Sequence, residues 1–296
     1  MAQTTDELLA KLKANKAKVS GTGGAGRARP VPHTMGEGGV NPVKLGMYGH
    51  TGAGKTFFNI GPLACGERIY VLSADFGSNG LITLENYYRH FEPEKMKESL
   101  ARVRFLELDN YTDTEGFLQS PRDYDPEIEK FDPTLLEFEG FSSFNIDILD
   151  EHILAHAPGA DGAGDLRKAG FTHTQQDWQG MKRGTLRVLR YFLSWHLGDK
   201  PIHKILTSLE SAPDVNDLTN KTERTMLIHG TARNLMGPAF DVILECFKRE
   251  GPEGLEYCYR CDGTSDKYLV KGRGFQLEPV EKAEPERIWK ILKREG

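Results

Sequence analysis

The sequence has little of what marks secreted and membrane proteins. Only four cysteines occur in 296 residues, which is too few for a disulfide framework and favours a reducing cytoplasm. No apolar run approaches the roughly 20 residues needed to span a bilayer, and the polar start of the chain lacks the apolar core of a signal peptide. We therefore expect a cytoplasmic protein with no membrane partner.

The chain also lacks an excess of basic residues. Its formal net charge is −5, which gives no global sign of nucleic-acid binding. The charge is unevenly distributed, because residues 1–40 are basic and rich in glycine whereas residues 109–140 are rich in Asp and Glu. We interpret 1–40 as an N-terminal arm and linker before a domain of residues 41–296, and 109–140 as an acidic surface insertion that offers a site for a protein partner.

One motif stands out in this composition. Residues 49–56 fit the phosphate-loop pattern G-x-x-x-x-G-K-[ST] at every fixed position. The motif consists of Gly49, His50, Thr51, Gly52, Ala53, Gly54, Lys55 and Thr56. An apolar run over residues 43–48 predicts a strand before the loop, and apolar residues after it predict a helix. Such a loop binds phosphate oxygens, so we expect ATP as cofactor, with Lys55 at the β and γ phosphates and Thr56 at Mg²⁺.

Strands and helices alternate along the rest of the chain. This pattern predicts an α/β fold with a mainly parallel sheet flanked by helices and with antiparallel strands on the C-terminal side. Further strands are expected at 68–73, 102–106, 144–149, 202–207 and 240–247, with a hairpin of 255–261 and 268–271. Helices are expected at 80–90, 178–195 and 284–293.

Phosphoryl transfer needs one carboxylate near Mg²⁺ and another to orient the attacking water. The expected strand 144–149 leads into Asp150 and Glu151, and ligands bind at the carboxyl ends of strands in open α/β sheets. Asp150 is therefore the candidate for the metal side, and both Asp75 and Glu151 are candidates for orienting the water. Thr207 and Ser208, also at a strand end, are suited either to sensing the γ-phosphate or to capping a turn.

Two other kinds of site fit poorly. Residues 220–223 resemble an N-K-x-D guanine motif, but the last residue is Glu223 and no strand leads into the segment. Cys258 and Cys261 have the spacing of a zinc-binding pair, but no second pair follows at a suitable distance, so strand packing explains them better.

The order of several landmarks resembles phage-encoded RecA-like P-loop ATPases, a family of minimal single-strand recombinases also described as phage nucleotide-binding proteins. The resemblance covers residues 43–273 and rests on the sequences GHTGAGKT, VLSADFG, NIDILDE, TQQDWQG, LMGPAFDVIL and VKGRG. It implies a RecA-like core that uses ATP and Mg²⁺. This chain has Asp75 where the family usually has Glu, and Glu151 where the family usually has a small residue.

The resemblance also implies partners and further site residues. Two loops of RecA-like proteins bind single-stranded DNA, and they correspond here to residues 158–174, with Arg167 and Lys168, and 211–228, with Lys221 and Arg224. A neighbouring subunit completes the ATP site with a basic residue, at the place of Lys271 and Arg273. We therefore expect a homo-oligomeric ATPase that acts on single-stranded DNA in phage recombination or replication, in the host cytoplasm if phage-encoded. The alternatives are a P-loop motor or loader that works through a protein partner and, ranked last, a small-molecule kinase.

Overall fold

The chain divides into two units, Met1–Gly39 and Val40–Gly296. The computed structural model describes residues 42–75, 80–155, 174–216, 221–228, 230–252, 254–262, 267–272 and 274–294. The predicted basic arm lies outside these residues.

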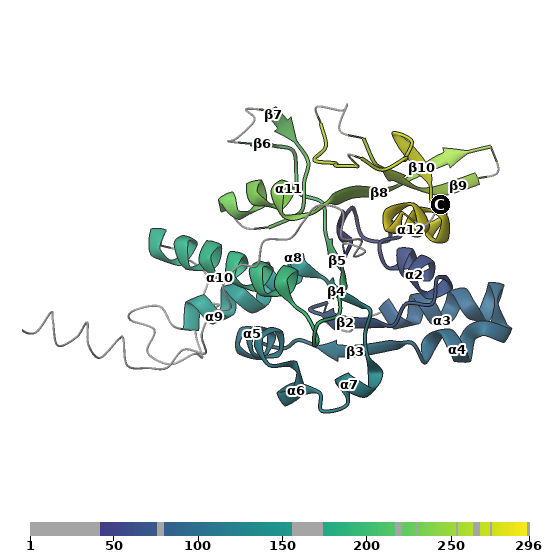
Figure 1. The fold of residues 1–296 in the computed structure, drawn as a ribbon. Coiled ribbons are helices and arrows are strands. Elements are labelled where there is room, and N and C mark those ends of the chain that lie inside the picture. Colours follow the sequence, from purple (N-terminus) through teal and green to yellow (C-terminus); the bar gives the residue numbers. More distant parts are fainter. Residues whose placement is uncertain are drawn as a thin grey trace, which may run out of the picture. The chain divides into compact units, whose positions relative to one another are not determined.

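An eight-stranded sheet forms the centre of this unit, in the order β10-β9-β8-β1-β5-β4-β2-β3 (Figure 1). Its strands are β1 (Lys44–Tyr48), β2 (Ile69–Ser73), β3 (Val103–Glu107), β4 (Leu135–Glu139), β5 (His203–Ser208), β8 (Val242–Gly251), β9 (Gly254–Arg260) and β10 (Val280–Lys282). The pairs from β8 through β1, β5, β4 and β2 to β3 are parallel, whereas β9 is antiparallel to both β8 and β10. A separate hairpin pairs β6 (Asp214–Asn216) with β7 (Lys221–Glu223).

Helices cover both faces of the sheet (Figure 1). They are α2 (Ile60–Ala64), α3 (Gly80–Phe91), α4 (Met96–Leu100), α5 (Tyr111–Gln119), α6 (Pro121–Tyr124), α7 (Ile128–Phe131), α8 (Phe141–Ser143), α9 (Leu149–Ala155), α10 (Gln175–Ser194), α11 (Met236–Ala239) and α12 (Pro285–Lys293). Short 3₁₀ segments are η1 (Thr56–Asn59), η2 (Pro93–Lys95) and η4 (Gly230–Leu235), and η3 (Phe144–Ile148) is a π-helical turn. None of these helices is long and apolar enough to cross a bilayer.

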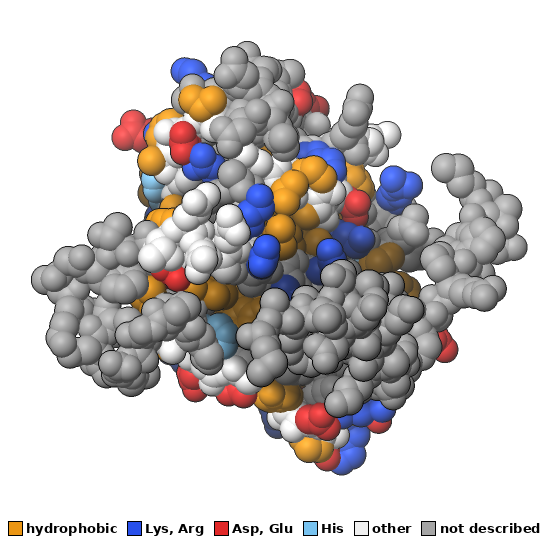
Figure 2. Space-filling model, turned by 90° about the vertical axis from the view of Figure 1, so that its left-hand side faces the viewer, with side chains coloured by type: hydrophobic (Ala, Val, Ile, Leu, Met, Phe, Trp, Pro, Cys, Tyr) orange, Lys and Arg blue, Asp and Glu red, His pale blue; other side chains and the backbone are white. Residues whose placement is uncertain are grey.

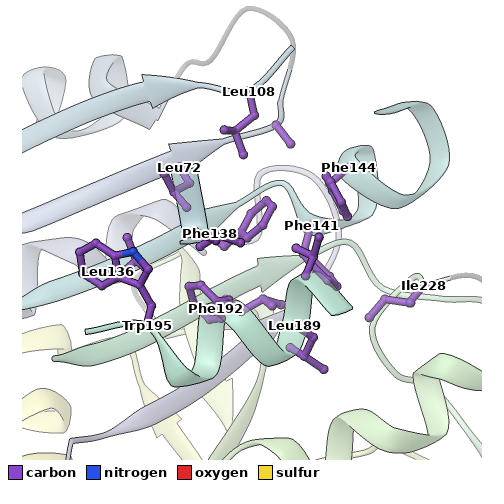
Figure 3. Packing of buried hydrophobic residues seen from close by; sticks show 14 of the residues in the cluster. Leu72, Leu108, Leu136, Phe138, Phe141, Phe144, Leu189, Phe192, Trp195 and Ile228 are labelled. Carbon is purple, nitrogen blue, oxygen red and sulfur yellow. The ribbon is translucent and has the colours of Figure 1, made fainter. Parts of the chain in front are cut away.

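Two hydrophobic cores result, because alternate side chains of a strand point to opposite faces. On one face, Leu136 and Phe138 of β4 pack with Phe192 of α10 and with the aromatic residues that follow β4 (Figure 3). On the other, strand residues pack with η1, α2, α3 and α12, where Trp289 is fully buried. The predicted class, a mainly parallel sheet flanked by helices with antiparallel C-terminal strands, is confirmed.

The strand predicted at 144–149 is wrong, and the correct strand is β4. Residues 144–149 are helical, in η3 and the start of α9, because Phe141, Phe144 and Ile148 recur at helical spacing and are buried on one side. The segment 109–140 is likewise not a surface insertion throughout, since its last strand, β4, lies between β5 and β2 in the sheet.

The predicted pairing of 255–261 with 268–271 is also wrong. β9 instead forms a hairpin with β8, with Gly251 opposite Gly254, and its other edge pairs with β10. Residues 268 and 271 make single bridges, Tyr268 to Arg224 and Lys271 to Ile243. The two glycines at the tip of the β8–β9 hairpin explain this pairing, because glycine tolerates the backbone of a tight turn, and Gly254 has φ +117°.

A buried lysine lies within the sheet. Lys204 of β5 is 2% exposed, its Nζ donates to the carbonyl oxygen of Ile202 at 2.7 Å, and it lies 5.8 Å from the centre of the Trp195 ring. Burial, reinforced by the charge of Lys44, lowers the pKa of Lys204 from 10.5 to about 7. Protonated Lys204 is therefore less favourable in the folded chain than in the unfolded chain, and this cost lowers the stability of the protein at neutral pH.

Replacing Lys204 with methionine is expected to stabilise the protein, and more at pH 6.5 than at pH 9.5. Between pH 7 and 10.5 the unfolded chain holds a proton that the folded chain has already released, so the penalty shrinks as the pH rises. The gain in unfolding free energy should be on the order of 3 kcal/mol smaller at pH 9.5. Urea denaturation at the two pH values measures this, with exposed Lys182→Met as control. A gain that does not change with pH would contradict a neutral Lys204.

Candidate active site

The phosphate-loop motif connects β1 to η1, as its sequence predicts. Gly52 and Gly54 have φ of +73° and +91°, a left-handed backbone that residues with a Cβ resist. The Lys55 ammonium folds back onto its own loop and donates to the carbonyl oxygens of Gly49 at 2.8 Å and His50 at 3.0 Å. Burial lowers the pKa of Lys55, partly offset by the negative charge of Asp75 and Glu139 among other neighbours. The lysine charge therefore lies against the carbonyl oxygens of its own phosphate loop.

A buried carboxylate faces the motif from β4. Thr56 Oγ1 donates to Glu139 Oε1 at 2.8 Å, and Glu139 is 6% exposed. Burial raises the pKa of Glu139, against the opposing effect of the Thr56 hydrogen bond. Two residues earlier on the same face of β4, Glu137 Oε2 accepts a hydrogen bond from Asn59 at 2.6 Å. Hydrogen bonds of the two glutamates thus connect the end of β4 to the last residue of the phosphate loop and to the segment that follows it.

Asp75 lies beside this carboxylate, after the end of β2. Its Oδ1 accepts a hydrogen bond from Ser143 Oγ at 2.7 Å. Gly140, directly after β4, has φ +73°, and a Cβ there would lie 2.3 Å from Asp75 Oδ1. Only glycine allows this approach, so the turn after β4 is built around the Asp75 carboxylate.

Thr207 and Ser208 join the same place from β5. Thr207 Oγ1 accepts a hydrogen bond from the Gly140 backbone N–H at 3.3 Å, and Ser208 Oγ lies 2.8 Å from Ser142 Oγ. Both residues are almost completely buried. Their hydroxyls therefore connect the ends of β4 and β5.

These groups line one cavity of about 670 Å³. Its walls are formed by Thr51, Gly52, Gly54, Lys55, Thr56, Phe57, Asp75, Gly80, Thr83, Glu139, Gly140, Ser142, Ser143, Thr207, Ser208, Leu209 and Tyr257. They come from the phosphate loop and η1, from the carboxyl ends of β2, β4 and β5 and the residues after them, from the start of α3, and from β9. This is the end of a parallel sheet at which ligands bind.

Several predicted residues lie elsewhere. Asp150 and Glu151 are on α9 and are not among the residues that line the cavity, because the strand expected before them is helical. Lys271 donates to the carbonyl oxygens of Phe240 and, at 3.4 Å, Gly237 of its own chain. Arg224 pairs with Glu210 at 2.7 Å, and Glu210 also lies 3.3 Å from His50 Nε2. Arg167, Lys168 and Arg273 lie outside the described residues, as does the side chain of Lys221.

Sequence reasoning missed Glu139, Ser143 and Tyr257. A signal for Glu139 exists in the segment Leu135–Glu139, where alternate positions are apolar and the strand ends in an acid followed by Gly140. The many acids before it hide this pattern. Tyr257 has no comparable signal, because a tyrosine in a strand is ordinary.

Among the described residues there is no group of three or more His, Cys, Asp and Glu side chains placed to hold a metal ion. Cys258 and Cys261 are buried free thiols, and burial raises the pKa of both. They are packing residues of β9 and the segment after it, as expected.

The chain matches no family model, and no curated protein matches it. Among solved structures it is similar to the KaiC-like protein PH0186 from Pyrococcus horikoshii OT3, with a TM-score of 0.40 and 12% identity over 82% of this chain and 87% of that one. It is also similar to the RadB recombinase, with a TM-score of 0.42 and 13% identity over 84% and 91% of the two chains. At these values neither likeness says what this chain binds or does.

Proposed function

We propose that this protein is a Mg²⁺-dependent ATPase of the RecA-like type. The observation that carries the proposal is the convergence of Lys55, Thr56, Glu139 and Asp75 on one cavity. A phosphate loop with its lysine, a hydroxyl paired with a buried carboxylate, and a second carboxylate opposite are the groups that nucleotide hydrolysis requires. The sheet order, which separates β1 from β4 by one strand, brings these groups together.

Lys55 supplies positive charge to the β and γ phosphates of bound ATP. In the structure it donates to two carbonyl oxygens of its own loop. A triphosphate offers the ammonium stronger, charged acceptors at the same place. We propose that the lysine exchanges its bonds to Gly49 and His50 for bonds to the phosphates.

Thr56 and Glu139 are the residues suited to hold Mg²⁺, in place of the predicted Asp150. The fit follows from their donors, because Mg²⁺ prefers hydroxyl, carboxylate and water oxygens. Glu139 Oε2 supports it further, since this buried oxygen has no hydrogen-bond partner. A bound ion would neutralise charge on the phosphates during transfer.

Asp75 is the acid that we propose orients the attacking water. Ser143 holds its carboxylate by a 2.7 Å hydrogen bond while Asp75 itself is exposed to the cavity. A carboxylate fixed in this way can accept a proton from water within hydrogen-bond reach. Glu151, the other candidate, lies on α9. Thr207 and Ser208 line the same cavity and stay candidates to sense the γ-phosphate, although in the structure their hydroxyls bond to Gly140 and Ser142.

We propose further that the ATPase acts on single-stranded DNA. Figure 2 looks onto the side on which α9 and α10 lie in Figure 1, and lysine and arginine side chains gather across this face. Lys182, Arg183 and Arg190 of α10 are exposed, and α10 directly follows in the sequence the predicted DNA-binding loop 158–174 with Arg167 and Lys168. Such charge supports binding to a nucleic-acid backbone despite the negative net charge of the chain. Of the second predicted loop, Lys221 stays a candidate DNA contact, whereas Arg224 is already neutralised by Glu210.

We also propose that the protein assembles into homo-oligomers. Lys271 donates to carbonyl oxygens of its own chain, as Lys55 does, and Lys271 and Arg273 both stay candidates for completing a neighbour's ATP site. An enzyme that depends on such a residue turns over faster per subunit as it assembles.

The decisive experiment measures ATP hydrolysis with and without single-stranded DNA at several protein concentrations and low salt. The proposal expects Mg²⁺-dependent hydrolysis that DNA stimulates several-fold and that rises per subunit with concentration. Hydrolysis that does not respond to DNA would support the ATPase assignment and contradict the role on DNA. It would favour a motor or loader that needs a protein partner. No ATP binding or hydrolysis would overturn the assignment.

A further inference from the structure

The β8–β9 hairpin brings an aromatic side chain onto the phosphate loop. Tyr257 of β9 lies so close to Gly54 that a Cβ at Gly54 would be 2.8 Å from Tyr257 Cδ1. The Tyr257 ring stacks on Phe57, the residue directly after Thr56, with ring centres 6.2 Å apart and planes inclined by 21°. Both rings line the cavity that holds the catalytic groups.

Phe57 packs at the edge of one hydrophobic core, whereas Tyr257 is not part of either core. Tyr257 is 40% exposed although its strand is part of the main sheet. Phe57 also touches Tyr87 of α3 edge-on, with ring centres 5.6 Å apart. The result is an aromatic surface at one side of a cavity that is otherwise lined mainly by glycines, hydroxyl side chains, acids and Lys55. Phosphates and Mg²⁺ bind to polar and charged groups, whereas a nucleobase can stack on an aromatic surface.

The ammonium group of a lysine on the neighbouring strand contacts the Tyr257 ring. Lys248 of β8 lies with Nζ 4.8 Å from the centre of the Tyr257 ring, a cation–π contact. The same Nζ would be 3.8 Å from a Cβ at Gly52. Lys248 therefore bridges the hairpin and the phosphate loop, and holds Tyr257 over the loop.

We propose that Phe57 and Tyr257 form the platform on which the base of the nucleotide stacks, with Lys248 positioning Tyr257. The inference rests on the proposed function and adds to it a binding site for the base, which the β8–β9 hairpin contacts. The phosphates lie along the loop up to Thr56, so the nucleoside end leaves the loop beside Phe57. Stacking on an aromatic side chain contributes about 1–3 kcal/mol per base, or roughly 5- to 150-fold in affinity.

The test compares two ligands, one with a base and one without. Isothermal titration calorimetry measures the binding of Mg-ATP and of Mg-tripolyphosphate to wild type, Tyr257→Ala and Tyr257→Phe. Leu255→Ala is the matched control, because Leu255 is exposed on the same face of β9 but does not line the cavity.

Tyr257→Ala is expected to weaken ATP binding at least about 5-fold and to leave tripolyphosphate binding within about 2-fold of wild type. Tyr257→Phe and Leu255→Ala should bind both ligands as wild type does. Equal weakening of both ligands would show that Tyr257 only supports the loop, and no weakening would show that the base lies elsewhere; either result overturns the platform alone. Wild type that binds neither ligand would overturn the proposed function as well.

Discussion

Replacing Lys55 with alanine is expected to lower ATP turnover at least about 10²-fold while the protein stays folded. The loss follows from the charge that Lys55 brings to the phosphates in the transition state, where a single positioned donor contributes about 10²- to 10³-fold. The fold should survive because, within the part of the chain that the structure describes, the ammonium donates to carbonyl oxygens of its own loop, those of Gly49 and His50. Burial lowers the pKa of Lys55, so the folded chain carries a penalty for its charge that the alanine variant no longer has.

Steady-state hydrolysis and thermal unfolding, measured on the same preparation, check this prediction. Lys95→Ala is a suitable control, because Lys95 pairs with Glu92 on the surface and is not among the cavity residues. It should hydrolyse ATP at the wild-type rate. Wild-type turnover by Lys55→Ala would remove the nucleotide assignment, and an unfolded variant would show that the lysine has a structural role.

The phosphate loop was predictable because its chemistry is local. Eight consecutive residues carry the glycines, the lysine and the threonine, and the strand before them is mostly apolar. Strand β1 is buried from Leu45 to Tyr48, and its apolar residues mark it as an internal strand of a parallel sheet. These features need no knowledge of which strand pairs with which.

The acids at the strand ends were only partly predictable, because they depend on pairing. β4 has Glu137 and Glu139 in its buried face, so it reads as polar although both glutamates are almost completely buried. Each carboxylate accepts a hydrogen bond from the segment after the phosphate loop, more than 70 residues away in the chain. Sequence patterns alone cannot distinguish such an internal acid from a solvated one, and the apolar run 144–149 took its place as the expected strand.

The aromatic wall of the cavity was not predictable for a related reason. Tyr257 reaches Phe57 because β9 folds back on β8, which itself pairs with β1. Periodicity predicted a strand at 255–261 but paired it with 268–271 in place of β8. The placement of Tyr257 follows from that pairing and not from the residues beside it.

The roles of the four acids can be separated by amide substitutions that keep their shape. Glu139→Gln and Asp75→Asn are each expected to lower kcat by about 10²-fold or more. Asp150→Asn and Glu151→Gln are the matched controls. They should retain nearly wild-type turnover, because α9 contributes no residue to the cavity wall.

The two damaging variants should differ in how they respond to Mg²⁺. Glu139 pairs with the Thr56 hydroxyl and has a buried second oxygen without a hydrogen-bond partner, so its loss should raise the Mg²⁺ concentration needed for half-maximal activity. Asp75 is held by Ser143 and faces the cavity, so Asp75→Asn should bind Mg-ATP as wild type does and remain slow at every Mg²⁺ concentration.

Measurements of kcat, ATP affinity and the Mg²⁺ dependence on all four variants test these assignments together. If Asp150→Asn or Glu151→Gln were as slow as Glu139→Gln, α9 would have to approach the phosphates and the cavity described here would not be the catalytic centre. If Asp75→Asn turned over normally, the attacking water would be oriented from elsewhere. Ser143→Ala then gives an independent check: because Ser143 touches Asp75 and not Thr56, it should slow hydrolysis less than Asp75→Asn and leave the Mg²⁺ dependence unchanged.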